Sequence, residues 1–415
     1  MFNKNQVKPL KLENRLQITK GFHGGLHSSM RRTLMVARYM GVLPLCGLHN
    51  PQSIQLRFTL RSPYSVIYIT GLLGQTMMMI MSLYLLCETS LTLPNFTNAL
   101  FYVSNLCSSL MLAFLGRSWP HFIRRVEVIE NKLPPFMTNL SMYCDLTMIF
   151  LLVATLVEHC FSVSYAVTVA SSCNSMDVVK TYFLYNVPWI FNYTPFTLWK
   201  GLICEMFNIQ STFMWSYSDL LIMQMGIYLA EHFKTHNALL KENLKQPNHS
   251  CDDLRSHYLS IVKLVQLANK LIGFYILTSF GGNLYFICMQ LFNSLNKSTT
   301  GHIVGCQLKN AEHMLLRGLE HTIYFTYSFT FLIMRTLLVL FLAARVNSLS
   351  MVPLAMLYEV PSSKFNLEVM RFIDQINNLK VGLSGLDFFY VTKSMILTLF
   401  GTVLTYELVL LQFNN

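Results

Sequence analysis

The sequence of 415 residues is poor in charge. Only 12% of its residues are Asp, Glu, Lys or Arg, whereas 53% are hydrophobic and the mean hydropathy is +0.41. Soluble domains carry about twice that share of charged residues, so this composition excludes an ordinary soluble globular protein. It indicates a polytopic membrane protein.

The sequence also lacks the motifs of common enzymes. It has no H-E-x-x-H zinc motif, no G-x-S-x-G nucleophile turn and no Walker phosphate loop. Its ten cysteines are scattered and form no C-x-x-C pair. We therefore predict that the chain is not an enzyme, holds no metal or other cofactor and binds no nucleic acid. The first twenty residues also lack a secretory signal, so we expect the first membrane span to direct insertion.

Seven predominantly apolar segments are long enough to cross the hydrocarbon core of a bilayer. The fold class predicted is therefore all-α, a polytopic membrane protein with seven transmembrane helices. The fourth, fifth and sixth segments exceed the length that a bilayer needs, so we expect their helices to continue into the cytoplasm. The segments are about 65–87, 95–115, 144–170, 197–230, 263–293, 314–345 and 388–412.

The distribution of Lys and Arg predicts the orientation. Residues 1–63 hold ten of them and a single acid, Glu13, and the even-numbered connections are also basic. By the positive-inside rule the N-terminus is cytoplasmic, and seven crossings make the C-terminus extracellular. The predicted units are a cytoplasmic segment at 1–63, six helices in 64–345, a cytoplasmic connection at 346–387 and a seventh helix in 388–415. An N-terminus on the inside argues against a G-protein-coupled receptor.

Residues 362–380 predict an amphipathic helix below the membrane. Phe365, Val369, Phe372, Ile376 and Leu379 recur at steps of three or four residues and form one apolar stripe. The helix either lies on the inner leaflet or joins a cytoplasmic bundle in which subunits meet. We favour the bundle, because a helix on a membrane surface would carry more Lys and Arg along its edges.

The end of the chain matches a family signature. Thr405 and Tyr406, followed after five residues by Gln412 and Phe413, match the T-Y-x5-Q-F ending of insect gustatory receptors. Residues 383–413 resemble the final segment of the sugar-receptor clade. The stretches "ARYMGVLPLCGL" and "STFMWSYSDLLIMQMGIYLA" are similar to the same clade, and the resemblance covers nearly the whole chain.

This resemblance implies a tastant-gated, non-selective cation channel in the plasma membrane of sensory neurons. It implies a homo- or hetero-tetramer with related subunits, joined by a cytoplasmic helical anchor and lined by the seventh helices. Each subunit would have its own outward-facing ligand pocket, and a sugar is the expected tastant. A bitter compound is the alternative ligand, and a metabotropic receptor or a transporter is the alternative class.

A sugar pocket needs hydrogen-bonding groups for the hydroxyls and aromatic faces for the C–H side of the ring. The outer halves of the predicted helices are rich in both. For any single residue, hydrogen bonding between helices is the alternative explanation. The candidates are Tyr102, Glu158, His159, Tyr165, Glu205, Asn208, Trp215, Asn283, Gln290, Glu320, His321 and Tyr324. The strongest of these are Glu158, Trp215 and His321.

The seventh helix is the predicted pore helix. A mainly apolar face can close a narrow pore by dewetting, and hydrogen bonding to neighbouring helices is the alternative role for its polar groups. Which of two overlapping stripes faces the ions stays open. The pore and gate candidates are Leu404, Leu408, Leu411, Gln412 and Phe413.

Two cysteines, Cys173 and Cys306, fall in predicted outer loops. The outside of the cell is oxidising, so a disulfide between these loops is one interpretation. Two free or separately buried thiols are the other.

Overall fold

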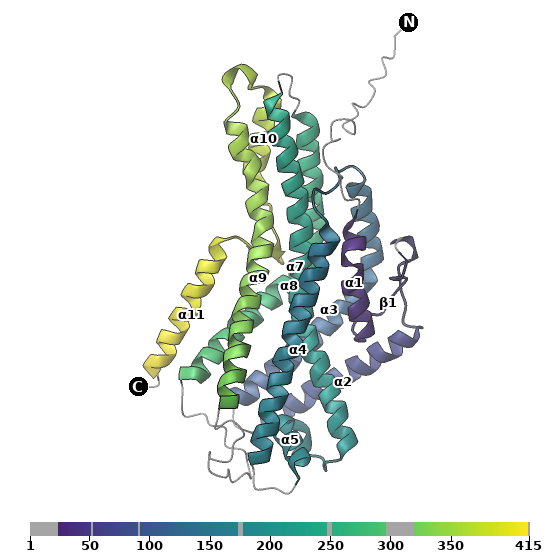
Figure 1. Ribbon diagram of the computed structural model, residues 1–415, viewed down its shortest axis with the longest axis vertical. Helices are drawn as coiled ribbons and strands as arrows, with labels where there is room; N and C mark the ends of the chain where they lie inside the picture. Colours follow the sequence, from purple (N-terminus) through teal and green to yellow (C-terminus); the bar gives the residue numbers. More distant parts are fainter. Residues whose placement is uncertain are drawn as a thin grey trace.

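The computed structural model describes residues 24–50, 53–89, 92–172, 177–246, 251–295 and 319–413. These form an elongated bundle of long helices (Figure 1), which confirms the all-α prediction. Two hairpins of two-residue strands join them, β1 (Leu45–Cys46) with β2 (Arg57–Phe58) and β3 (Ser384–Gly385) with β4 (Phe389–Tyr390). The helices are α1 (Leu26–Tyr39), α2 (Pro63–Glu88), α3 (Leu93–Glu130), α4 (Leu140–Ser172), α5 (Val178–Asn186), α6 (Pro188–Phe191), α7 (Leu198–Lys245), α8 (Asp252–Leu295), α9 (Leu319–Tyr358), α10 (Leu367–Asn378) and α11 (Ser394–Phe413).

Within the described residues, five helices are long and apolar enough to cross a membrane. They are α2, α3, α4, α8 and α9, which correspond to the first, second, third, fifth and sixth predicted spans. The fourth predicted span is helical as expected, but α7 is more polar than these five. The seventh offers a shorter apolar stretch, Ser394–Tyr406. Seven crossings therefore stay a prediction.

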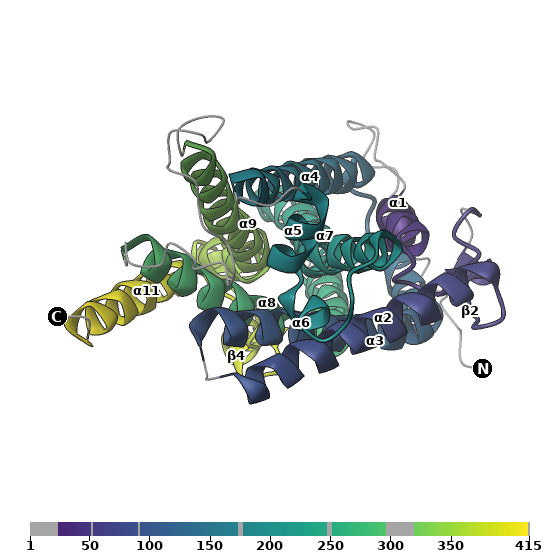
Figure 2. The ribbon, with the colours of Figure 1, turned by 90° about the horizontal axis from the view of Figure 1, so that it is seen from below.

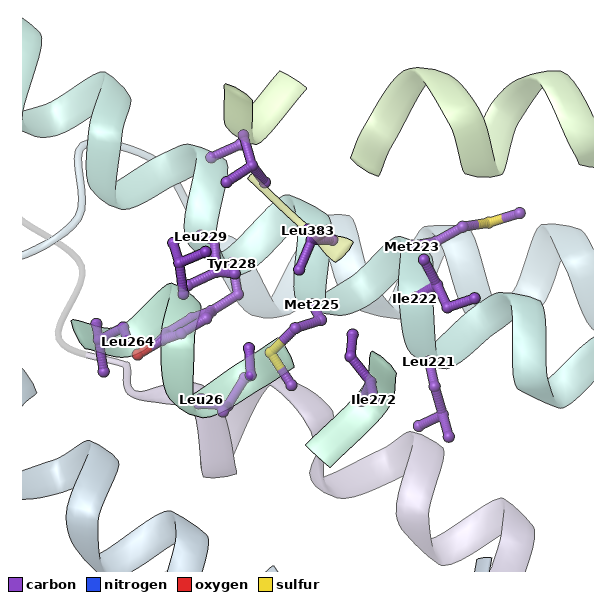
Figure 3. Packing of buried hydrophobic residues seen from close by; sticks show 14 of the residues in the cluster. Leu26, Leu221, Ile222, Met223, Met225, Tyr228, Leu229, Leu264, Ile272 and Leu383 are labelled. Carbon is purple, nitrogen blue, oxygen red and sulfur yellow. The ribbon is translucent and has the colours of Figure 1, made fainter. Parts of the chain in front are cut away.

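The polarity of α7 follows from its place in the bundle. It contacts α1, α2, α3, α4, α8 and α9, and most of its side chains from Phe213 to Asn237 are buried. Figure 3 shows Leu221, Ile222 and other residues of this helix packed against its neighbours. A helix enclosed by other helices can hydrogen-bond its polar groups to protein instead of exposing them to lipid.

Helix α1 lies in a region for which the sequence predicted only a cytoplasmic segment. Leu26, Met30 and Leu34 are fully buried on its inner face, and the helix contacts α3, α4 and α7. Its first backbone N–H, at Leu26, donates a 2.9 Å hydrogen bond to Oε1 of Glu130. The hydroxyl of Tyr228 donates to the same oxygen at 2.8 Å. Glu130 ends α3, so residues 117–130, which we assigned to the basic connection after the second predicted span, continue that helix.

The amphipathic helix is present as α10, and its stripe is buried within the same chain. Val369, Phe372 and Ile376 have no exposed surface. The ring of Phe372 lies 5.4 Å from that of Tyr258 on α8 and 6.1 Å from that of His236 on α7. The stripe therefore packs inside a helical bundle of its own chain, and the cytoplasmic position of that bundle stays a prediction. A role in subunit contact stays a prediction.

The predicted stripe was wrong at its first residue, and the predicted seventh span began too early. Phe365 precedes α10 and is exposed. Residues 389–390 are strand β4, and the turn before them holds Leu386 and Asp387 at positive φ. The hydroxyl of Ser384 donates to Oδ1 of Asp387 at 3.0 Å, which stabilises this turn. Helix α11 therefore begins only at Ser394.

Helix α11 projects from the side of the bundle (Figures 1 and 2). It contacts α8 and α9, where Val403 is buried. Leu397, Leu404 and Leu408 are 74%, 65% and 62% exposed. One face of this apolar helix is therefore covered by its own chain, and another is open to lipid or to other subunits.

Candidate ligand-binding site

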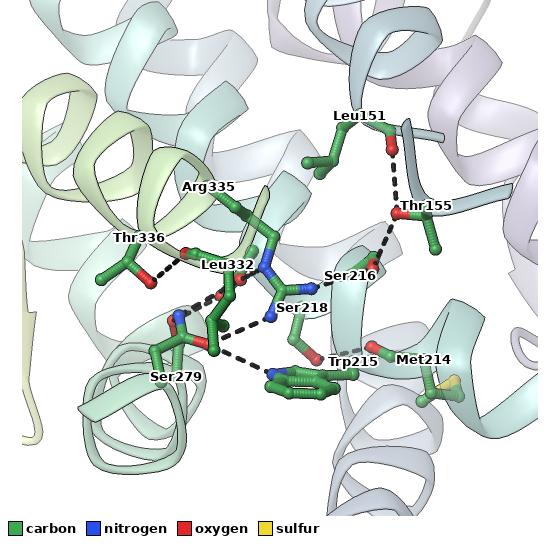
Figure 4. Close-up of polar contacts among 12 residues, drawn as sticks. Leu151, Thr155, Met214, Trp215, Ser216, Ser218, Ser279, Leu332, Arg335 and Thr336 are labelled. Carbon is green, nitrogen blue, oxygen red and sulfur yellow. Dashed lines mark hydrogen bonds and ion pairs between the residues drawn. The ribbon is translucent and has the colours of Figure 1, made fainter. Parts of the chain in front are cut away.

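A fully buried ion pair lies at the centre of the helix bundle. Nε of Arg335 on α9 is 3.0 Å from Oδ2 of Asp219 on α7, and the two side chains are 3% and 0% exposed. The hydroxyl of Ser279 and the amide of Asn283, both on α8, also donate to Asp219. Nη1 of Arg335 donates to the hydroxyl of Ser216 at 3.1 Å (Figure 4). The charges thus join α7, α8 and α9 through one hydrogen-bonded network.

Trp215 belongs to this network, as does Asn283. The indole N–H of Trp215 donates to Oδ1 of Asn283 at 3.2 Å, and Nη2 of Arg335 donates to the same oxygen at 3.2 Å. The guanidinium of Arg335 lies 4.4 Å from the centre of the Trp215 ring, a cation–π contact. Phe286 covers the ring from α8 at 4.5 Å. These contacts fix the orientation of the indole.

Glu158 forms a second polar group, together with Gln290. The hydroxyl of Ser328 on α9 donates to Oε1 of Glu158 on α4 at 2.7 Å. The amide of Gln290 on α8 donates to the same hydroxyl oxygen at 3.3 Å. Tyr165 and Tyr324 lie on the same two helices, α4 and α9, with their rings stacked at 5.6 Å and 14°. A carboxylate, an amide and two flat aromatic rings therefore gather between α4, α8 and α9.

His159 and Glu205 form a third group, on the α5 side of α4. Nε2 of His159 is 3.4 Å from Oε1 of Glu205 on α7. The hydroxyl of Tyr182 and the amide of Asn186, both on α5, donate to Oε2 of the same carboxylate at 3.0 and 3.4 Å. Asn208, one turn further along α7, also reaches Glu205. Helix α5 belongs to the connection between α4 and α7. Glu205, on α7, therefore joins this connection to both long helices.

Three of the predicted residues lie at the margins of these groups. Tyr102 on α3 is buried, and its ring packs edge-on against Phe101 and Trp189 at 5.3 Å each. Glu320 lies in the first turn of α9. His321 belongs to the same turn, but its side chain is outside the described residues.

The twelve predicted residues therefore divide into a central network, two peripheral groups and these margins. Sequence reasoning missed Asp219 and Arg335, which dominate the central network, and Tyr182, Asn186 and Ser328, which hold the peripheral carboxylates. The first two carried a signal. Each is an isolated charge inside a predicted span, and an intramembrane charge is by default a candidate for a functional role. Hydroxyls such as Ser328 carry no comparable signal.

Other predictions fall partly or wholly outside the described residues. Cys173 and Cys306 both do, so their disulfide stays a prediction. On α11 the side chains of Leu411 and Phe413 are not described, whereas Leu404, Leu408 and Gln412 are exposed. In the terminal motif the hydroxyl of Thr405 donates to the carbonyl of Gly401 at 2.9 Å, a contact within the helix.

The fold defines the class of the protein. The insect olfactory receptor OR5 from Machilis hrabei, in complex with eugenol, superposes with a TM-score of 0.67 over 94% of this chain and 98% of that chain, at 16% identity. A structure described simply as that receptor gives a TM-score of 0.64 at 14% identity, over 92% and 97% of the two chains. This chain therefore has the fold of that insect olfactory receptor.

Residues 14–415 match the model of the trehalose receptor family, and the chain belongs to that family. Gustatory receptor 5a for trehalose from Drosophila melanogaster is 30% identical over 94% of this chain and 86% of its own length. Gustatory receptor for sugar taste 64f from the same organism is 30% identical over 94% and 81%. These matches confirm the resemblance to the sugar-receptor clade of insect gustatory receptors, which are receptors and not enzymes.

Proposed function

We propose that this protein is a sugar receptor and a ligand-gated, non-selective cation channel of taste neurons. The observation that carries the proposal is the set of carboxylates and aromatic rings in one half of the bundle, in a chain of the trehalose receptor family. Glu158 and Glu205 offer strong acceptors for sugar hydroxyls, and Tyr165, Tyr324 and Trp215 offer flat faces.

The hydrogen-bonding capacity of this region favours a sugar over a bitter compound as ligand. Glu158 and Gln290 share a single hydroxyl, Ser328, and Oε1 of Gln290 is buried without a hydrogen bond. A buried acceptor without a donor costs free energy that a ligand hydroxyl could recover. A mainly apolar bitter ligand would leave these groups unsatisfied.

A tetramer with α11 around the pore accounts for the exposed face of that helix. Leu404, Leu408 and Gln412 lie on exposed parts of α11, where neighbouring copies would place them around a common axis. Leucine side chains at a constriction exclude water and ions until the helices move apart. We extend the proposal to a cytoplasmic N-terminus, seven crossings and an extracellular C-terminus in the plasma membrane, on the basis of the basic connections.

Currents from cells expressing the protein test the ligand site. Glu158→Gln removes the charge but keeps the shape, and should raise the half-maximal sugar concentration at least tenfold. Trp215→Ala should do the same by removing a ring face. Glu242→Gln and Trp199→Ala are matched controls, because both residues are exposed and outside the three groups. Unchanged dose–response curves for Glu158→Gln and Trp215→Ala would place the pocket elsewhere.

The channel itself is tested in excised inside-out patches. Sugar applied to the outer face through the pipette should open unitary currents without nucleotides or G proteins. Leu408→Ala or Gln412→Ala should raise the current without ligand, and Leu146→Ala, an exposed residue of α4, should not. Sugar uptake without unitary currents would instead indicate a transporter, and currents that need G proteins a metabotropic receptor.

A further inference from the structure

A cavity of about 530 Å³ lies between α3 and α8, at the end of the bundle opposite the candidate ligand site. Its lining includes Arg124, Arg125 and His121 from α3 and Lys263 and Lys270 from α8. All five side chains are exposed. Two helices that are distant in sequence therefore gather four permanent cations and a histidine around one opening.

These cations are not neutralised by the described part of the chain. No Asp or Glu among the described residues lines the cavity or forms an ion pair with the four Lys and Arg side chains. The two acids of the same stretch of α3 are engaged elsewhere. Glu127 accepts from the hydroxyl of Ser53 at 2.7 Å, and Glu130 accepts from α1 and α7.

The cavity lies where the apolar parts of both helices end. Arg117 is the first cation after the apolar part of α3, and Lys270 directly precedes that of α8. At 1.5 Å per residue, Arg124 and Lys263 each lie about 10 Å beyond those points. Bilayer headgroups extend roughly 5 to 8 Å beyond the hydrocarbon core. The cations therefore extend from the depth of the lipid headgroups to a level slightly further from the hydrocarbon core.

The lining is also partly apolar. Val128 and Ile129 on α3 and Leu267 on α8 contribute to it, as does the polar side chain of Gln266. Leu267 lies on the membrane side of Lys263, whereas Val128 and Ile129 lie further from the membrane than Arg124 and Arg125. A lipid presents a phosphorylated headgroup while its apolar tail stays in the bilayer, so it fits a basic opening that begins at the membrane boundary.

We propose that this cavity binds the headgroup of an anionic phospholipid of the inner leaflet, of the class that carries additional phosphate monoesters on an inositol ring. Such a headgroup bears several negative charges and projects from the leaflet toward Arg124, Arg125 and Lys263. Arg side chains bind phosphate oxygens in pairs, and Lys contributes point charges. The proposal uses the predicted cytoplasmic position of this end of the bundle and does not depend on the identity of the tastant.

Lipid binding to the purified full-length protein in phosphatidylcholine nanodiscs tests this proposal. The probe is a fluorescent short-chain phosphatidylinositol bisphosphate. Each cation near an anionic lipid contributes about fivefold to affinity, so Arg125→Gln/Lys270→Gln should weaken binding roughly 25-fold. Lys241→Gln/Lys380→Gln, which removes two exposed cations from the same end of the bundle, should change it less than twofold. Arg125→Lys should retain most of the binding.

Competition distinguishes the sources of the phosphate. Unlabelled short-chain lipid should displace the probe more effectively than free inositol trisphosphate, and phosphatidylserine should compete weakly. Equal competition by inositol trisphosphate would overturn the assignment to a lipid, and equal competition by phosphatidylserine would overturn the phosphate-monoester requirement. Equal binding by the wild type and the double variant would overturn the site. If the double variant does not fold, Lys270→Gln alone should show the fivefold loss. Since the measurement is binding and not current, its failure leaves the proposed channel function untouched.

Discussion

Breaking the buried Asp219–Arg335 pair should destabilise the bundle much more than removing both charges together. With Arg335→Met, the carboxylate of Asp219 keeps only the neutral donors Ser279 and Asn283 in a site without solvent. A buried charge that has lost its partner costs about 3 to 5 kcal/mol. The Met side chain keeps the volume of the Arg stem, so little of this cost comes from a cavity.

Asp219→Asn should cost less than Arg335→Met. Nη1 and Nη2 of Arg335 would keep their hydrogen bonds to Ser216 and Asn283, and its contact with the Trp215 ring would also remain. We expect about 2 to 4 kcal/mol for this variant. In Asp219→Asn/Arg335→Met no charge is left in the site, and the loss should fall to about 1 kcal/mol. The coupling between the two positions is then roughly 4 kcal/mol or more.

Thermal unfolding of each purified protein in nanodiscs ranks the wild type and the three variants by stability. The expected ranking is wild type, the double variant, Asp219→Asn and then Arg335→Met. If the double variant loses as much free energy of unfolding as the two single variants together, the two positions are not coupled and the prediction is refuted. Single variants as stable as the wild type would show that water solvates the pair. Glu242→Gln, which breaks an exposed pair with Lys245, is the control and should leave the unfolding temperature unchanged.

Three further predictions concern packing and pH. Gly226→Ala should destabilise the contact of α7 with α9 by about 1 to 3 kcal/mol, because the added Cβ would lie 2.7 Å from the carbonyl oxygen of Leu342. Thermal unfolding measures this loss. In the control Gly281→Ala, the added Cβ meets nothing within 4 Å, so the unfolding temperature should not change. Phe372→Ala should cost about 3 to 5 kcal/mol and increase proteolysis around α10, and wild-type resistance in the variant would contradict its buried packing. Burial lowers the pKa of His236, near the C-terminal end of α7, to about 3. The unfolded chain thus binds the proton of His236 first as the pH falls below about 6.5, so this residue should account for about 2 kcal/mol of the loss of stability between pH 7 and pH 5. Burial lowers the pKa of His232 in the same way, so His236→Gln should make the profile shallower without flattening it, and an unchanged slope would refute the assignment.

The sequence predicted the helices well where their signal was continuous. The apolar segments of α2, α4, α8 and α9 are visible in composition, and α10 is visible in its periodicity. It failed at α1 and at the β3–β4 hairpin. The buried face of α1 carries Leu26, Met30 and Leu34 at steps of four residues, a helical periodicity that the prediction passed over, and the contacts with α3, α4 and α7 that bury it join segments far apart in the chain. The turn at Leu386 and Asp387 has positive φ at both residues; Asp is a common turn residue, but Leu rarely takes this conformation, so the usual turn signals are only partly present.

The sequence predicted which types of residue form the candidate site, but not which of them contact one another. Trp215 and Asn283 were chosen as polar or amphipathic residues of neighbouring spans, and the structure joins them by a direct hydrogen bond. Glu158 and His159 are adjacent in sequence, yet one turns toward α9 and the other toward α7. Adjacent residues on a helix point about 100° apart, so helix packing decides which neighbour each one meets.

Composition, the terminal motif and the resemblance over most of the chain are enough to identify a helical membrane protein and its family, and they show that the cations gather in residues 1–63 and in the even-numbered connections. These properties depend on composition and on short-range order, which each segment carries alone. That Asp219 meets Arg335, and that four cations of α3 and α8 surround one cavity, follows from the tertiary structure. Those residues are far apart in the chain, and the free energy of their interactions exists only once the helices have packed together.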